Sequence, residues 1–375
     1  MILKNLTYYD ENFQKQTGDI VIENGKFAAL GKTDAPGLDM QACTAVPGFI
    51  DTHIHGAAGG DFCDCSAESL QKIAAYLAKN GVTAFCPTTM TLGEEALTSI
   101  LSLGDRLADT LPGARILGFH LEGPFIALSK KGAQNPAYVR PGTSAEFDRL
   151  NDAAGGRVKI ITMAPEAFDS RDFITHVCTW AHVSVGHTAA AYEEAAAAYR
   201  QGADRATHLF NAMTPLQHRA PGVVGAALEN DSVFCELICD GYHLAPAVVR
   251  TVFKTLGRDR AVVVSDSMKA AGLAPGKYDL GGQDVFVDEK QDVARLGDGT
   301  IAASITNVFQ EFKNLLSFGI DFETALRACT INPARSVGCD AFTGSIAVGK
   351  DADLVILNDR LEIEQVYIKG ERYGG

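Results

Sequence analysis

Apolar runs of strand length alternate with amphipathic stretches through most of the chain. The runs end near residues 51, 85, 121, 162, 185, 208, 239 and 265, and such alternation is typical of βα units around a parallel sheet. Helical periodicity predicts helices at 66–80, 93–109, 167–180, 189–201, 245–257, 304–318 and 321–331, with no clear helix after the sixth run and an inserted hairpin at 283–302. Eight runs are the strand number of an α/β fold of the (β/α)₈ TIM-type barrel class.

The two ends of the chain have a different pattern, made of short β-segments. Residues 19–27 place an Asn-Gly hairpin signal between apolar runs, and residues 344–357 have the same β-rich character. We therefore expect both termini to pair into one small, discontinuous β-sandwich domain. The predicted domains are 1–46 together with 340–375 for the sandwich, and 47–339 for the barrel.

The composition excludes several classes of protein. Hydrophobic residues make up 46% of the chain and charged residues 21%, and no stretch approaches the 18 apolar residues of a membrane span. A formal net charge of −13 disfavours nucleic-acid binding, which rewards basic patches. The first residues read as a strand rather than a signal peptide. Nine cysteines without framework spacing fit reduced thiols, so we expect a cytoplasmic protein.

Histidine and carboxylate residues follow the ends of the predicted strands, where barrels place their active sites. His53 and His55 follow the first strand, and residues two apart on extended backbone share a face, so both imidazoles can reach one ion. Glu122 ends the third strand, His187 the fifth and His208 the sixth. A lone histidine is more often structural, but equivalent positions around one barrel predict a shared metal site.

Further polar residues lie near this set. Asp266 ends the eighth strand, where a carboxylate beside a metal stays ionised and can take a proton from water; the alternative is a helix N-cap. His120 could be a ligand, a support for a ligand or a packed core histidine, and we favour support. Cys63 and Cys65 also lie close in sequence, but the nitrogen and oxygen ligand set is complete without them.

The order of these motifs resembles the amidohydrolase superfamily and, within it, the N-acetylglucosamine-6-phosphate deacetylase family. The matching segments are Pro-Gly-Phe-Ile-Asp-x-His-x-His-Gly, His-Leu-Glu-Gly-Pro-Phe, Gly-His-Thr, Thr-His-Leu-Phe-Asn-Ala-Met, Asp-Gly-Tyr-His and Ser-Asp-Ser, followed by Asn332-Pro333-Ala334 and Gly-Lys-Asp-Ala-Asp-Leu-Val. The resemblance covers nearly the whole chain. It implies hydrolysis of the acetyl group of N-acetylglucosamine 6-phosphate in amino-sugar catabolism, by a homodimer that binds a small molecule and neither membrane nor nucleic acid.

The resemblance also assigns residues. One or two divalent ions per subunit are implied, zinc first, with iron, manganese or cobalt as alternatives. Glu122, His187 and His208 would hold the principal ion, His53 and His55 would complete a second site, and Asp266 would be the catalytic acid/base. Implied substrate contacts are Ala133, Gln134, Asn211, Ala212, Arg219, Asp240, Gly241, Tyr242, His243, Ile301, Ala302 and Ala303. Of these, Asn211 and the backbone of Ala212 would meet the phosphate, helped by Arg219 and His243, which would reach across a dimer interface.

Two departures and three alternatives remain. Gln134 stands where related sequences usually carry histidine, and it cannot offer a positive charge; Ala303 stands where they commonly carry glycine. The substrate could instead be N-acetylgalactosamine 6-phosphate. A dihydroorotase-like amidase or a deaminase would often use a carboxylated lysine at the end of strand four, whereas Lys159 lies at the other end. A metal-free homologue would have to bury six polar groups without a cation.

Overall fold

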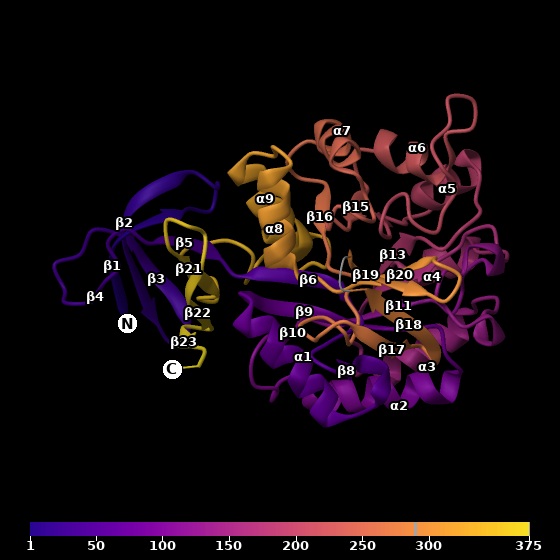
Figure 1. Ribbon diagram of the computed structural model, residues 1–375, viewed down its shortest axis with the longest axis horizontal. Coiled ribbons are helices and arrows are strands. Elements are labelled where there is room, and N and C mark those ends of the chain that lie inside the picture. Colours follow the sequence, from indigo (N-terminus) through magenta and orange to yellow (C-terminus); the bar gives the residue numbers. More distant parts are fainter. Residues whose placement is uncertain (289–290, 375) are drawn as a thin grey trace.

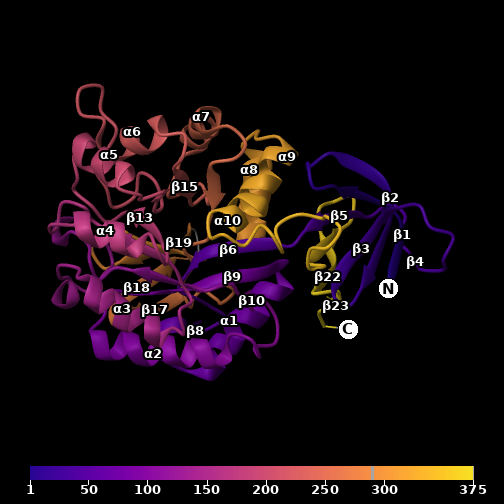
Figure 2. The same ribbon diagram turned by 180° about the vertical axis from the view of Figure 1, so that it is seen from behind.

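The computed structural model describes residues 1–288 and 291–374, and of residues 291 and 292 only the backbone. Figures 1 and 2 show a barrel of parallel strands with helices around it, and a smaller β-structure beside it that contains both chain ends. The smaller part has a hydrophobic core of its own, but its Val46, Val355 and Leu357 belong to the larger core between the barrel and its helices.

Eight strand positions form the barrel, and neighbouring strands are all parallel. The backbone N–H of Asp266 donates to the carbonyl of His53 at 2.9 Å, and that of His55 to the carbonyl of Ser267 at 2.9 Å, which joins the last strand to the first. The predicted (β/α)₈ barrel is confirmed. Its strands are β6 (Phe49–Ile54), β9 (Val82–Thr89), β10 (Arg115–Ile116) with β11 (Phe119–Glu122), β12 (Val158–Met163), β13 (His182–Val185), β14 (Arg205–Ala206), β15 (Phe234–Leu237) and β16 (Ala261–Val263).

The helices follow from amphipathic sequence where one face meets the strands. In α1, Leu70, Ile73 and Leu77 are buried, and Ser66 caps the first turn. None of the helices in the described parts of the chain is long and apolar enough to cross a membrane. The helices are α1 (Ala67–Lys79), α2 (Glu94–Leu107), α3 (Ser144–Ala153), α4 (Arg171–Val177), α5 (Tyr192–Arg200), α6 (Gly222–Glu229), α7 (Pro246–Leu256), α8 (Val308–Ser317), α9 (Phe322–Cys329) and α10 (Ile331–Arg335), with 3₁₀ turns η1 (Phe62–Asp64), η2 (Leu128–Lys130) and η3 (Pro136–Tyr138).

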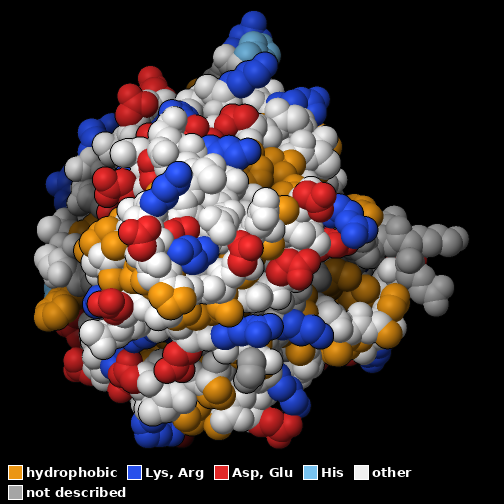
Figure 3. Space-filling model, turned by 90° about the vertical axis from the view of Figure 1, so that its left-hand side faces the viewer, with side chains coloured by type: hydrophobic (Ala, Val, Ile, Leu, Met, Phe, Trp, Pro, Cys, Tyr) orange, Lys and Arg blue, Asp and Glu red, His pale blue; other side chains and the backbone are white. Residues whose placement is uncertain are grey.

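The chain ends share one sheet. Asn24 and Gly25 form the hairpin turn between the strands at 15–23 and 26–31, with φ of 51° and 77°, as the Asn-Gly signal predicts. The N–H of Phe27 donates to the carbonyl of Lys350, and the carbonyl of Phe27 accepts from the N–H of Gly349. These bonds join the third strand to the C-terminal segment around the core that contains Phe27. The predicted sandwich from both termini is confirmed, while its exact domain boundaries stay a prediction. Its strands are β1 (Ile2–Tyr9), β2 (Lys15–Glu23), β3 (Lys26–Gly31), β4 (Leu38–Asp39), β5 (Thr44–Pro47), β21 (Leu354–Leu357), β22 (Ile363–Ile368) and β23 (Glu371–Arg372). Figure 3 shows Lys and Arg interspersed with Asp and Glu on the face at this end.

An antiparallel four-stranded sheet, here called the hood, covers one side of the barrel rim. Its residues Leu280 and Val285 pack against Met90 and Met268 of the barrel. The hood is larger than the hairpin predicted at 283–302, of which residues 289–290 lie outside the described residues. Its strands are β17 (Gly276–Leu280), β18 (Gln283–Asp288), β19 (Gln291–Leu296) and β20 (Ile301–Ser304); a small ribbon, β7 (Gly56–Ala57) with β8 (Gly60–Asp61), follows β6.

Candidate active site

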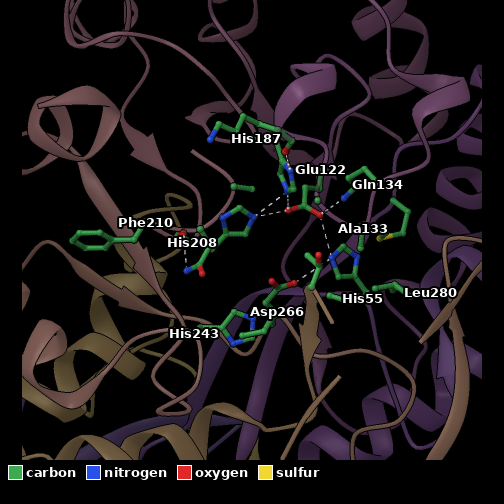
Figure 4. A pocket seen from close by; sticks show the side chains of 18 of the residues that line it. His55, Glu122, Ala133, Gln134, His187, His208, Phe210, His243, Asp266 and Leu280 are labelled. Atoms are coloured by element: carbon green, nitrogen blue, oxygen red, sulfur yellow. Dashed lines mark hydrogen bonds and ion pairs between the residues drawn. The ribbon is translucent and has the colours of Figure 1, made fainter. Parts of the chain in front are cut away.

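A cavity of about 440 Å³ opens at the carboxyl ends of the barrel strands (Figure 4). Barrel strands and their following loops bring polar side chains to it, and the hood adds Leu280, Ile301 and Ala302 on one side. Of the predicted metal ligands and acid/base, the cavity is lined by His55, Glu122, His187, His208 and Asp266, while His53 lies fully buried beneath. Residues far apart in sequence therefore meet at one rim.

Glu122, His187 and His208 form one of the clusters that could hold a metal ion. The Nε2 atoms of both histidines lie 3.1 Å from Glu122 Oε1 and 3.1 Å from each other. Nδ1 of His187 lies 2.8 Å from the carbonyl of Lys130, which can only accept, so Nδ1 carries the proton and Nε2 presents its lone pair. Two imidazole nitrogens that face one carboxylate oxygen at these distances suit a divalent cation between them.

His53, His55 and Asp266 form the second cluster. Asp266 Oδ1 lies 3.3 Å from Nε2 of His55 and 3.5 Å from Nε2 of His53, and His55 Nε2 also lies 3.2 Å from Glu122 Oε2. Nδ1 of His55 faces the carbonyl of Thr88 at 3.2 Å, which again leaves Nε2 as the ligand atom. Glu122 thus contacts both clusters, since its Oε1 also lies 3.3 Å from Nε2 of His53, and both groups could hold a metal ion.

Strand ends at the site have unusual backbone conformations. His187, His208 and Asp266 have φ of 47°, 29° and 46°, in the left-handed region that side chains with a Cβ rarely adopt. Each costs on the order of 1–2 kcal/mol. Backbone strain of this kind persists where surrounding structure enforces it, and here three strained residues belong to the two clusters. The backbone of these three residues is no longer extended, so their side chains do not follow the alternation of the strands and meet above the barrel.

The charges of the clusters balance one another. Burial would raise the pKa of the Glu122 carboxyl, but His53 and His187 hold it well below its usual value. Burial would lower the pKa of His55, yet Asp266 and Glu122 outweigh it and raise that pKa to about 10. The carboxylates therefore attract positive charge strongly, as protons or as a metal ion, and the two compete.

Other residues support the clusters from below. Glu236 Oε2 lies 3.0 Å from His53 Nδ1, and the Arg205 guanidinium donates to Glu236 Oε1 at 2.6 Å. His120 packs edge-on against His53 at 4.4 Å between ring centroids and bonds Thr162 Oγ1 at 2.8 Å. The sequence analysis missed Glu236 because it lies within β15, whereas Glu122 was identified at the end of its strand.

The predicted substrate residues divide into two groups. The cavity lining includes Ala133, Gln134, Asn211, Ala212, His243, Ile301 and Ala302. Among the described residues, the following predicted contacts do not line the cavity: Asp240, Gly241, Tyr242, Ala303 and Arg219. Asp240 Oδ2 instead holds His243 Nδ1 at 2.6 Å, Ala303 is buried in β20, and Arg219 lines a separate surface pocket beside α5. Its segment projects from the barrel before α6 in Figures 1 and 2.

Gln134 and Lys130 add two findings. The Gln134 amide accepts from the Thr91 N–H and donates to Glu122 Oε2, both at 2.6 Å, so it holds the shared carboxylate (Figure 4). Lys130 is the one lysine or arginine among the described residues that line the cavity. The sequence analysis missed it because Lys130, next to Lys131 in a loop, belongs to no distinctive pattern.

Known proteins share this architecture. The sequence pattern of the amidohydrolase family matches residues 44–373. The chain is 34% identical to N-acetylglucosamine-6-phosphate deacetylase of Bacillus subtilis, over 99% of this chain and 96% of that protein. It is also 34% identical to N-acetylgalactosamine-6-phosphate deacetylase of Escherichia coli O157:H7, over 93% of each. A mutant of the Mycobacterium smegmatis N-acetyl-D-glucosamine-6-phosphate deacetylase, solved in complex with N-acetyl-D-glucosamine-6-phosphate, superposes with a TM-score of 0.93 at 33% identity, over 100% of this chain and 99% of that one. The chain belongs to the amidohydrolase family, where it groups with the deacetylases of amino-sugar 6-phosphates.

Proposed function

We propose that the chain is a metal-dependent deacetylase that hydrolyses N-acetylglucosamine 6-phosphate to glucosamine 6-phosphate and acetate. The observation that carries this proposal is the pair of clusters that share Glu122 inside a cavity at the carboxyl end of the barrel. A deacetylase at 34% identity over 99% of the chain supports the substrate class. The chain would act in the cytoplasm, as a homodimer.

The principal ion would be held by Glu122, His187 and His208, and a second ion by His53 and His55 with help from Asp266. Imidazole and carboxylate ligands suit zinc first, and also iron, manganese or cobalt. A divalent ion supplies polarisation of the amide carbonyl and acidification of water at neutral pH. The chain contributes the fixed orientation of its ligands, which Gln134, Lys130 and Glu236 hold from behind.

Asp266 would move the protons. Burial would raise its pKa, but His53 and His55 lower it, so the carboxylate is ionised and can accept a proton from water. The same oxygen can then return this proton to the leaving nitrogen, which departs as the amine of the sugar. The product carbonyl carbon keeps the water oxygen and leaves as acetate.

Recognition of the sugar phosphate would fall to the rest of the cavity. Asn211 and the backbone N–H of Ala212 would meet the phosphate, with positive charge from Lys130 of the same chain. Arg219 lies too far round the surface to line its own cavity, so it would act on the cavity of a second copy. His243, oriented by Asp240, would contact the sugar.

The experiment compares acetate release from four compounds: N-acetylglucosamine and N-acetylgalactosamine, each with and without the 6-phosphate. We expect the phosphorylated glucosamine derivative to be hydrolysed fastest, and metal analysis to find one or two divalent ions per chain. Equal rates with and without phosphate would contradict the phosphate contacts. A metal-free protein that neither hydrolyses any of the four nor recovers activity with added zinc would contradict the function itself.

The galacto epimer is the second candidate. A deacetylase for N-acetylgalactosamine 6-phosphate matches the chain at the same 34% identity. The epimers differ at one hydroxyl, and a site built to bond one hydroxyl can reject the other strongly. A higher kcat/KM for the galacto compound would decide for this alternative and leave the metal chemistry unchanged.

A further inference from the structure

Glu236 is a charged side chain at the centre of the barrel that the proposed reaction does not use. It lies in β15, fully buried, and does not line the cavity. Its two oxygens have different partners: Oε1 accepts from Arg205, and Oε2 accepts from the backbone N–H of His208 at 3.2 Å and lies 3.0 Å from Nδ1 of His53. Each oxygen of this buried carboxylate therefore has a fixed partner, a cation on one side and an imidazole on the other.

Arg205 determines which oxygen faces which way. Its guanidinium is fully buried and donates to the Ser336 carbonyl at 2.9 Å, to Glu236 Oε1 at 2.6 Å and to Thr52 Oγ1 at 3.3 Å. A guanidinium can only donate, so the Glu236 atom beside it must be an acceptor. The short charged bond therefore anchors the carboxylate, and Oε2 remains for His53.

Oε2 is an acceptor as well, so Nδ1 of His53 carries the proton. With Nδ1 engaged by Glu236, Nε2 is the nitrogen of His53 left to bind a metal ion; it has no hydrogen-bond partner among the described residues and faces Glu122 and Asp266 at 3.3 and 3.5 Å. We propose that Glu236 is a positioning residue that fixes the tautomer of His53, and thereby allows His53 to bind the second metal ion. This inference rests on the proposed metal centre. Binding of the second ion would thus depend on Glu236, a residue that contacts neither ion nor substrate.

The substitution Glu236→Gln should reverse the tautomer while it preserves the shape of the side chain. Arg205 requires an oxygen at 2.6 Å, because an amide N–H there would face a charged donor. In that orientation the new amide N–H group takes the place of Oε2. It donates to His53 Nδ1, and it also faces the backbone N–H of His208 at 3.2 Å, which is a donor too. A charge-assisted bond is roughly twice as strong as a neutral one, so the Arg205 contact decides the orientation. Nδ1 must then accept, and Nε2 must carry the proton.

The test measures zinc binding by competition with a chromogenic chelator. We expect wild type to hold two ions, and Glu236→Gln to hold the principal ion unchanged but the second about 10–100-fold more weakly. Glu311→Gln is the matched control. Glu311 is also fully buried, accepts the Cys239 N–H at 2.8 Å, and keeps its proton because burial and Asp240 raise its pKa, so glutamine changes no charge there. This control should bind both ions as wild type does.

A second measurement needs no variant of Glu236 to fold. In the zinc-loaded wild type, proton NMR should show a slowly exchanging imidazole N–H for His53 Nδ1 that is lost in His53→Asn. Its absence in the wild type would overturn the inference, as would unchanged binding of both ions by Glu236→Gln. A wild type that holds only one ion would also overturn it and leave the principal site standing. A wild type that binds no zinc would instead overturn the proposed metal centre itself.

Discussion

Asp266 lies at the point where the two clusters meet the cavity. It is 7% exposed, so it can reach a substrate, and its carboxylate contacts His55 rather than a lysine or arginine. Its strained backbone, at φ 46°, places it beyond the end of β16 instead of within the strand. A residue so placed fits the role of proton acceptor better than that of a helix cap.

We predict that Asp266→Asn lowers kcat by at least about 10²–10⁴-fold, the usual contribution of a general acid or base, because an amide cannot accept the proton of water. Glu122, His187 and His208 are unchanged, so metal analysis should still find the principal ion. Stopped-flow or steady-state assays of acetate release measure the rate. Turnover near the wild-type rate would remove Asp266 from the mechanism.

A second residue-scale prediction concerns Glu311. Burial and the charge of Asp240 raise the pKa of its carboxyl well above the usual value, so the folded protein keeps a proton that the unfolded chain releases near pH 4.5. This group favours folding below that pH, and the contribution is lost as pH rises toward the folded pKa. Glutamine does not titrate, so Glu311→Gln does not lose stability in this way as the pH rises. Thermal unfolding should show a gain in Tm for the variant that grows from pH 5 to pH 8; a gain independent of pH would contradict it.

Residue by residue, the sequence revealed the groups with a motif and missed those without one. The spacing of His53 and His55, and Glu122 at the end of an apolar run, identified side chains that the structure does bring together. Glu236 escaped because it lies inside a strand, and its importance depends on Arg205, with which it pairs only once the barrel closes.

At the scale of elements, strand ends aim the clusters, and glycine controls how closely the strands approach. At Gly186, just before His187, a Cβ would lie 2.5 Å from Thr207 Cβ and 3.0 Å from Thr162 Cγ2, in the neighbouring barrel strands or at their ends. Only a residue without a side chain lets the end of β13 fit between β12 and the segment after β14. His187 takes its position from this fit.

We predict that Gly186→Ala destabilises the fold by about 1–3 kcal/mol, the cost of an extra methyl group in a packed interior, and weakens binding of the principal ion because His187 must shift. Calorimetry and chelator competition measure the two effects. The control is Gly276→Ala on the exposed strand β17, where the nearest atom to an added Cβ is a ring carbon of Tyr278 at 3.8 Å. Equal effects of both variants would contradict the packing argument.

Elements with a strong apolar stripe were predicted well, and those without one were not. The helix predicted at 245–257 is α7 to within a residue at each end. The sequence analysis missed α3, whose buried apolar residues are only Phe147 and Leu150, and left the helix after the sixth strand undefined. That helix, α6, is apolar with two glycines and has no polar face to set a period. The hood extends further toward the N-terminus than the predicted hairpin because β17 is mostly exposed and lacks strand-like alternation.

On the scale of the whole molecule, charge sets a problem for an anionic substrate. The chain carries a formal net charge of −13, and among the described residues that line the cavity Lys130 is the one lysine or arginine. Arg219, on an exposed loop with Leu216 50% exposed beside it, is free to contact another copy. A dimer would bring that positive charge to the neighbouring cavity.

Mixing two inactive variants tests this arrangement. Asp266→Asn removes the proton acceptor and Arg219→Ala the borrowed cation, so each homodimer should turn over poorly. If both are unfolded and refolded together, half of the dimers are mixed, and each mixed dimer holds one complete site, which restores about a quarter of wild-type activity. Acetate release before and after mixing measures the recovery. No recovery in a sample shown to contain mixed dimers would place Arg219 outside the neighbouring site.

The shared terminal sheet has a consequence for how the protein is made. β5 pairs on one side with β1 and on the other with β21, which is synthesised some 300 residues later. While a ribosome is still translating the barrel, β5 therefore presents an open, apolar edge that only the last segment of the nascent chain can cover. A chain truncated after the barrel would keep that edge unpaired, and the truncated protein would be prone to aggregate through it.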